Sequence, residues 1–228
     1  MASPALFVSI LGGILPALVW LAFWLLEDRC QPEPKKFIFL CFIGGMLMVW
    51  PALVLERFFV PYVSGTTLIL AWATIEELLK FGAAAMLALW WASYDEPLDA
   101  VIYLVTAALG FSAMENILFL MTPIAQGDVL RSIVTGDLRF IGATLLHTLS
   151  SATIGIFVAL AFTAPAHTRR MAALGGVILA IFLHTLFNFF ILKGGGGSTF
   201  WVFLIIWCGI VGVLLATEHL KQPAKDYC

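Results

Sequence analysis

Residues 66–91 read TTLILAWATIEELLKFGAAAMLALWW, an apolar stretch that is interrupted only by Glu76, Glu77 and Lys80 near its middle. About 20 consecutive apolar residues are enough for a helix to cross a bilayer, and this stretch is long enough. Ionisable side chains inside such a span are costly and normally face a protein interior or a water-filled cavity. The stretch therefore predicts one helix of a membrane bundle, with its charged face turned away from lipid.

The composition of the whole chain extends this prediction. Of the 228 residues, 62% are hydrophobic and 11% are charged, and the mean hydropathy is +1.02. An ordinary globular chain is about a quarter charged. Since backbone groups in hydrocarbon must pair within a helix, the expected fold is an all-α, polytopic membrane helix bundle. The net charge of -2 argues against nucleic acid as a partner.

Apolar stretches of spanning length predict about seven transmembrane helices. They lie at residues 5–26, 37–55, 66–91, 98–121, 140–163, 171–192 and 199–216, and the longest loop is expected at Pro123–Arg139. We expect residues 1–228 to form a single integral membrane domain, with the chemistry concentrated at about residues 66–192.

Basic residues indicate how the bundle is oriented in the cell membrane. One side would hold Arg29, Lys35, Lys36, Arg169, Arg170, Lys221 and Lys225, and the other Arg57, Arg131, Arg139 and Lys193. Because Lys and Arg are enriched in cytoplasmic loops, this bias favours an outer N-terminus and a cytoplasmic C-terminus.

Polar residues of chemical interest lie within four of the predicted spans: Glu76, Glu77, Lys80, Glu115, Asn116, His147, His184 and Asn188. At about 1.5 Å per residue, the depths from the outer ends of the spans are roughly 15 Å for Glu76, 9 Å for Glu115, 10 Å for His147 and 12 Å for His184. All four depths fall in the same half of the membrane. The simplest explanation is one shared site.

Helical spacing and charge support a functional role for this set. Glu76 with Lys80, and His184 with Asn188, are spaced i,i+4 and share helical faces. Each pair alone could serve packing. Three glutamates against one lysine, however, leave an excess of negative charge that a proton, a histidinium or a bound cation must balance.

These groups suit hydrolysis of an amide by an activated water molecule. A carboxylate beside water in a low dielectric is a competent general base, and either Glu76 or Glu77 could serve, with Lys80 orienting one of them. His184 and Asn188 could donate to a developing oxyanion, and His147 could protonate the leaving amine. The pattern leaves open which glutamate is the base.

The same residues resemble a known family. Glu76-Glu77-Leu-Leu-Lys80 resembles the E-E-x-x-K motif of the PrsW intramembrane proteases. The stretch Glu96-Pro-Leu-Asp99 with Gly110-Phe111-Ser-Ala-Met-Glu115-Asn116 is similar to the D-G…G-F-x-x-x-E-N block of that family. His147 and His184-x-x-x-Asn188 are similar to its two later histidine segments. Ala100 and Leu104 stand where glycines are expected, which bears on helix packing more than on catalysis.

The resemblance implies a glutamic-type intramembrane endopeptidase, distantly similar to the CAAX-prenyl endopeptidase and bacteriocin-processing superfamily. In that superfamily a motif glutamate and a histidine on the next motif helix activate water, and the H-x-x-x-N pair forms the oxyanion hole. Glu115 occupies that histidine's position here, so His147 would supply its role. The implied substrate is a single-pass membrane protein, an anti-sigma factor, cut near the outer face.

Three alternatives remain from the sequence, one of which is a non-catalytic membrane scaffold. In a zinc-dependent protease, Glu115, His147 and His184 would be the ligands and Glu76 the base. Because the chain has no H-E-x-x-H helix, we expect no metal or other cofactor. In a proton- or cation-coupled transporter the same buried charges would line a pathway.

Overall fold

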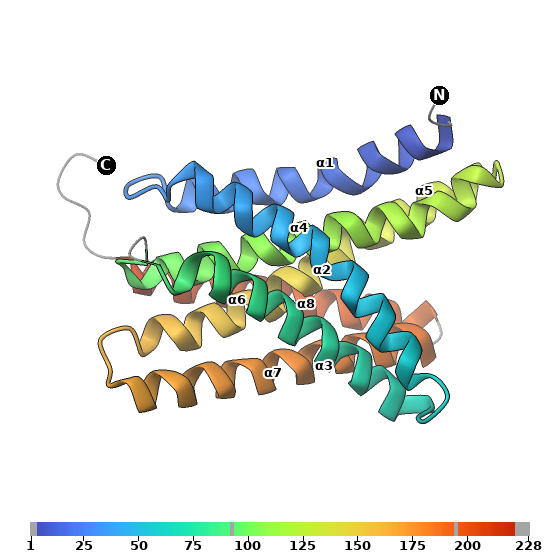
Figure 1. Ribbon diagram of the computed structural model, residues 1–228. Coiled ribbons are helices and arrows are strands. Elements are labelled where there is room, and N and C mark those ends of the chain that lie inside the picture. Colours follow the sequence, from blue (N-terminus) through green and yellow to red (C-terminus); the bar gives the residue numbers. More distant parts are fainter. Residues whose placement is uncertain (1–3, 92–93, 194–195, 222–228) are drawn as a thin grey trace.

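The computed structural model describes residues 4–91, 94–193 and 196–221, which form helices joined by turns, with no strand among them (Figure 1). The helices are α1 Pro4–Glu27, α2 Lys35–Phe59, α3 Gly65–Ala84, η1 Ala85–Leu89, α4 Pro97–Ala125, α5 Val129–Leu138, η2 Arg139–Ala143, α6 Thr144–Leu160, α7 Ala166–Lys193 and α8 Gly196–Leu220. Here η1 and η2 are π-helical segments. The predicted all-α bundle is confirmed.

Within the described residues, 6 helical segments are long and apolar enough to cross a membrane. They are Leu6–Glu27, Lys35–Phe59, Pro97–Ala125, Val129–Leu160, Ala166–Lys193 and Thr199–Leu220. The remaining predicted span, residues 66–91, is helical through α3 and η1 but carries three charged residues. Those residues are withheld from lipid, since Glu76 is 7% exposed and Glu77 and Lys80 are 0% exposed.

The central helix is α4, which packs against α1, α2 and α6 and is buried over most of its length (Figure 1). Small residues such as Ala100, Ala107 and Gly110 let neighbouring helices approach α4 closely on more than one face. Helix α3 lies between α2 and α7, and α8 packs on α6. The elements that bear the polar residues therefore adjoin one another.

Glycines allow α2 and α4 to cross with their backbones in contact. A Cβ added at Gly45 of α2 would lie 1.9 Å from the carbonyl oxygen of Ala107. A Cβ added at Gly110 of α4 would lie 1.9 Å from the carbonyl oxygen of Phe42. Membrane helices associate closely through such small residues, and only glycine fits at these two positions.

The crossing of α4 and α6 shows how the bundle accommodates Ala100 in place of the expected glycine. The glycine stands on the partner helix instead: a Cβ at Gly155 of α6 would lie 2.6 Å from Val101 Cα and 3.1 Å from the carbonyl oxygen of Ala100. Close backbone contact is thus kept with the small residue on the other side of the interface.

The predicted loops are partly wrong. Residues 123–139 contain the helix α5, whose N-terminus is capped by Asp128 through a 3.0 Å hydrogen bond from the Arg131 backbone N–H. No residue of α5 is buried, and α5 begins the segment Val129–Leu160, which is apolar enough to cross a membrane. Helix α7 likewise begins at Ala166, earlier than the predicted start at Met171.

Candidate active site

Helices α3, α4, α6 and α7 bring the sequence-predicted side chains into one cluster. The residues are Glu76, Glu77 and Lys80 from α3, Glu115 from α4, His147 from α6 and His184 from α7. All of them are buried except Glu115, whose side chain is 21% exposed. The cluster forms because α3 packs on α7 and α4 packs on α6.

Glu77 is held on two sides. Lys80 Nζ donates to Glu77 Oε1 at 2.6 Å, and His184 Nδ1 lies 2.6 Å from the same oxygen. Lys80 Nζ also lies 2.8 Å from His147 Nδ1. A buried ion pair is stable only when further hydrogen bonds satisfy its members, and these contacts supply them. Glu77 and Lys80 therefore link the two histidines.

Glu115 extends this chain of contacts toward the surface. Its Oε2 lies 2.9 Å from His147 Nε2 and accepts a hydrogen bond from Arg139 Nη2 at 2.7 Å. The resulting network of polar contacts runs in the order Arg139, Glu115, His147, Lys80, Glu77, His184. It contains two cations and two carboxylates, so its charges balance.

Phe111, one helical turn before Glu115 on α4, covers the middle of this network of contacts. The centroid of its ring lies 5.3 Å from Lys80 Nζ and 5.7 Å from the centroid of the His147 ring. An aromatic face attracts an ammonium group and excludes water. Phe111 thereby shields the Lys80 contacts.

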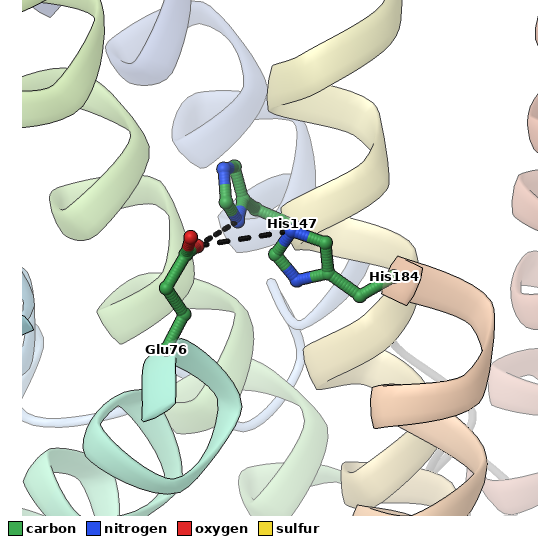
Figure 2. A group of neighbouring side chains, drawn as sticks. All are labelled: Glu76, His147 and His184. Atoms are coloured by element: carbon green, nitrogen blue, oxygen red, sulfur yellow. Dashed lines mark ion pairs between the residues drawn. The ribbon is translucent and has the colours of Figure 1, made fainter. Parts of the chain in front are cut away.

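Glu76 is the acid that has no counter-charge in this network, because the two cations of the network already pair with Glu77 and Glu115. Its Oε2 is buried and accepts no hydrogen bond from the described residues. That oxygen lies 3.9 Å from His147 Nδ1 and 3.8 Å from His184 Nε2. Figure 2 shows the Glu76 carboxylate directed toward both rings. Three atoms that can accept hydrogen bonds thus converge around a point where Lys80 is the one donor among the described residues.

The hydrogen-bond partners assign the ring protons of the two histidines. His184 Nδ1 faces the Glu77 carboxylate and must carry a proton, and in the neutral ring Nε2 is then an acceptor toward Glu76. His147 Nε2 faces the Glu115 carboxylate and carries the proton, which leaves Nδ1 to accept from Lys80. The two histidines are therefore opposite tautomers.

The donor set at the centre fits a zinc ion. Glu76, His147 and His184 each offer one ligand atom, and these atoms lie within 4.8 Å of one another. Two histidines and one glutamate are a common set for catalytic zinc, and each histidine here also contacts a second carboxylate, as zinc ligands usually do. The set expected from the sequence, with Glu115 in place of Glu76, does not converge in this way, since Glu115 Oε2 lies at His147 Nε2 and Arg139.

Other polar residues lie on the helices that carry the cluster. Asn188 is half-buried on α7, one turn beyond His184. Ser150 and Ser151 are buried on α6, and their hydroxyls have no hydrogen-bond partner among the described residues. Because both nitrogens of His147 contact other groups, neither serine forms a serine–histidine pair.

Two residues near the cluster were not predicted from the sequence as site residues. Arg139 was counted in an outer loop, but it begins η2 and pairs with Glu115. Glu56 of α2 is half-buried and interacts electrostatically with Glu76 and Glu115. Both stand at the edge of an apolar run, where hydropathy gives no information about which way a side chain points.

The chain matches a known family over most of its length. Residues 33–215 match the family described as PrsW family intramembrane metalloprotease. No solved structure matches the chain.

Curated relatives agree with this match. The chain is similar to Protease PrsW of Geobacillus kaustophilus, with 26% identity over 231 residues that cover 96% of each protein. It is 28% identical to Protease PrsW of Oceanobacillus iheyensis over 84% of this chain and 86% of that protein. It is 30% identical to Protease PrsW of Bacillus subtilis over 51% of this chain and 55% of that protein.

Proposed function

The chain belongs to the PrsW family of intramembrane proteases and is a peptide hydrolase, and we propose that Glu76 activates the water molecule that attacks the peptide bond. One observation carries this proposal: Glu76 is the only acid of the three motif glutamates that neither a lysine nor an arginine pairs in the described cluster. A general base must have a free oxygen beside the site of the water, and Glu76 Oε2 meets that condition.

The geometry around Glu76 suits one water molecule. Of the three acceptors around this point, Lys80 donates to His147 Nδ1, and Glu76 Oε2 and His184 Nε2 stay free and lie 3.8 Å apart. A water molecule has two protons to donate, so it can serve both acceptors. Its oxygen lone pairs then face away from them, toward the carbonyl carbon of a substrate.

The hydrolysis then proceeds in two steps. The water oxygen bonds to the carbonyl carbon while its proton passes to Glu76, which gives a tetrahedral oxyanion. Collapse of this oxyanion breaks the C–N bond, and the proton on Glu76 passes to the leaving amine nitrogen. Since Lys80 occupies His147 Nδ1, Glu76 is better placed than His147 to return that proton.

Asn188 is the group we assign to the oxyanion. The Nδ1–H of His184 is used by Glu77, so that ring has no donor left for a substrate. The amide of Asn188, one helical turn along the same face of α7, is a neutral donor of the kind that stabilises oxyanions.

The test uses the full chain in membranes. It is co-expressed with a panel of single-pass membrane proteins from its own host, each tagged at both ends, and fragments are detected by immunoblot. The parent chain and Glu218→Gln, an exposed change on α8, should cleave at least one panel member, and Glu76→Gln should cleave none. Parental cleavage by E76Q excludes Glu76 as the base.

A second candidate is zinc-dependent hydrolysis at the same position. The convergence of Glu76, His147 and His184 favours it. The matching family, which is described as one of intramembrane metalloproteases, favours it as well. A zinc ion bound there would supply a water molecule acidified to near neutral pH. Against it stands Lys80, whose ammonium lies 2.8 Å from one of the three ligand atoms and would repel a divalent cation.

Metal analysis separates the two candidates. Protein purified without chelator is assayed for zinc before and after dialysis against a strong chelator. We expect no stoichiometric zinc in the parent chain and full activity after dialysis. Zinc at one equivalent, lost together with activity and absent from Glu76→Gln, establishes the metal-dependent reaction instead.

The substrate class and the orientation are part of the proposal. The resemblance to PrsW proteases supports a single-pass anti-sigma factor cut near the outer face, and the Lys/Arg bias supports an outer N-terminus. Membership in a protease family removes the support for a proton- or cation-coupled transporter. The panel above should therefore include the host's anti-sigma factors.

A further inference from the structure

Arg139 is held at three points by α4. Its Nη2 donates to Glu115 Oε2 at 2.7 Å, its Nε donates to Asn116 Oδ1, and its guanidinium lies 4.0 Å from the centroid of the Phe119 ring. Its side chain is 14% exposed. A guanidinium with two hydrogen bonds and an aromatic contact is fixed in orientation, unlike an exposed arginine.

The π-helical segment η2 brings Arg139 to this position. Arg139 and His147 are eight residues apart, and a regular α-helix would place them about 80° apart around its axis. The wider turns of η2 reduce that angle, so both side chains point toward α4. Single π turns of this kind are frequent at functional sites.

Asn116 is oriented so that it receives Arg139. Its amide nitrogen donates to Thr144 Oγ1 at 3.1 Å and lies 3.4 Å from Ser112 Oγ. The amide oxygen is therefore left to face the guanidinium. Buried polar groups of α4 and α6 thus fix the arginine before any substrate is present.

The contact matters because one oxygen serves two donors. Glu115 Oε2 accepts from Arg139 and lies 2.9 Å from His147 Nε2. If Glu115 turned away, the Nε2–H of His147 would lose its acceptor, and the ring could rotate so that Nδ1 no longer faces the Lys80 ammonium and either nitrogen can carry the proton. Lys80 would then lose its contact with His147, and the water position beside Glu76 would be lost.

We propose that Arg139 is a positioning residue for the hydrolysis: it holds Glu115 so that His147 carries its proton on Nε2 and Lys80 stays between His147 and Glu77. The consequence for catalysis rests on the function proposed above. The effect on the histidine ring does not, and it can be measured without substrate.

The first experiment reads the histidine ring directly. The full chain, labelled with ¹⁵N-histidine and reconstituted in lipid bilayers, is studied by solid-state NMR. His167→Gln and His219→Gln, both exposed, remove the other histidine signals. The parent should show one ring protonated on Nδ1 and one on Nε2. Arg139→Gln should turn the Nε2-protonated signal into a mixture of tautomers, and Arg139→Lys should retain part of the Nε2-protonated signal. Arg131→Gln, which removes a charge from exposed α5, is the control and should leave both signals unchanged.

The second experiment uses the panel protein that the parent chain cleaves fastest. Arg139→Gln should lower kcat about 10- to 100-fold with KM unchanged, as loss of an orienting partner does. The double variant with Glu115→Gln should be no slower than E115Q alone, because both changes act through one contact.

Three results overturn the proposal. The first is an unchanged tautomer signature in R139Q and R139K. The second is a raised KM with unchanged kcat in R139Q, which identifies a substrate contact. The third is that the losses of kcat in R139Q and E115Q add up in the double variant. If R139Q does not fold, R139K and E115Q carry the same measurements. A changed ring signature in a protein that cleaves no panel member contradicts the proposed function and leaves the role of Arg139 intact.

Discussion

Glu76 and Glu77 are neighbours in sequence, but α3 directs them to different environments. Glu77 Oε1 lies 2.6 Å from both Lys80 Nζ and His184 Nδ1, whereas Glu76 Oε2 accepts no hydrogen bond from the described residues and lies between two imidazole rings. Adjacent residues on a helix point about 100° apart, which is enough to separate a carboxylate that holds the structure together from one that is left for chemistry.

This difference predicts opposite effects on stability. Glu77→Gln removes the counter-charge of buried Lys80 and should lower the free energy of unfolding by about 3–5 kcal/mol. Glu76→Gln removes an uncompensated acid and should leave the melting temperature unchanged or raise it. Thermal unfolding of both variants in one detergent checks this. Equal destabilisation by the two changes contradicts the assigned roles.

Asn188→Ala tests the oxyanion assignment. Removal of one oxyanion donor typically lowers kcat by about 10²–10³. We expect that loss with little change in KM or in melting temperature, measured on a cleaved single-pass substrate. Thr185→Ala on the same helix removes a hydroxyl that donates to the Ile181 carbonyl, and it should keep parental kcat. Parental kcat in N188A excludes Asn188 from the reaction.

A group of acids far from the site predicts how stability depends on pH. Glu33, between α1 and α2, accepts a hydrogen bond from Tyr103, and burial together with the neighbouring Asp99 carboxyl raises the pKa of Glu33 from 4.5 to about 9. Burial likewise raises the pKa of Glu96 to about 7 and that of Asp28 to about 6. The folded chain therefore holds protons that the unfolded chain releases.

The sign of the effect follows from linkage. When an acid has a higher pKa in the folded state, its stabilisation is complete below the unfolded pKa and is lost as pH rises toward the folded value. The melting temperature should thus fall between about pH 5 and pH 9. Glu33→Gln should flatten this slope, and Asp137→Asn, an exposed change on α5, should keep it. A melting temperature that rises over this range contradicts the assignment.

The helix crossing predicts a strong effect of one methyl group. Gly45→Ala or Gly110→Ala would place a Cβ 1.9 Å from a carbonyl oxygen of the facing helix, so α2 and α4 must separate. Either variant should lose stability and yield when extracted in detergent. Gly212→Ala on α8, where nothing lies within 4 Å, is the matched control and should behave as the parent.

Hydropathy located the helices well, because membrane insertion depends on the local apolar content of a segment. It missed α5, a helix of 10 residues of which none is buried, and it counted Arg139 as a loop residue. The depth arithmetic placed Glu76, Glu115, His147 and His184 in one half of the membrane, since the rise per residue of a helix is fixed. It gave no information on which atoms meet.

From the sequence alone came a membrane bundle, a set of polar residues at a common depth and the motifs that resemble a protease family. Only the tertiary structure decided that Glu77 is bound by Lys80 and His184, that Glu76 is left free and that Arg139 joins the cluster. The reason is physical: Glu77 and His184 are 107 positions apart, and whether their atoms meet depends on how α3 and α7 pack, which no local pattern encodes.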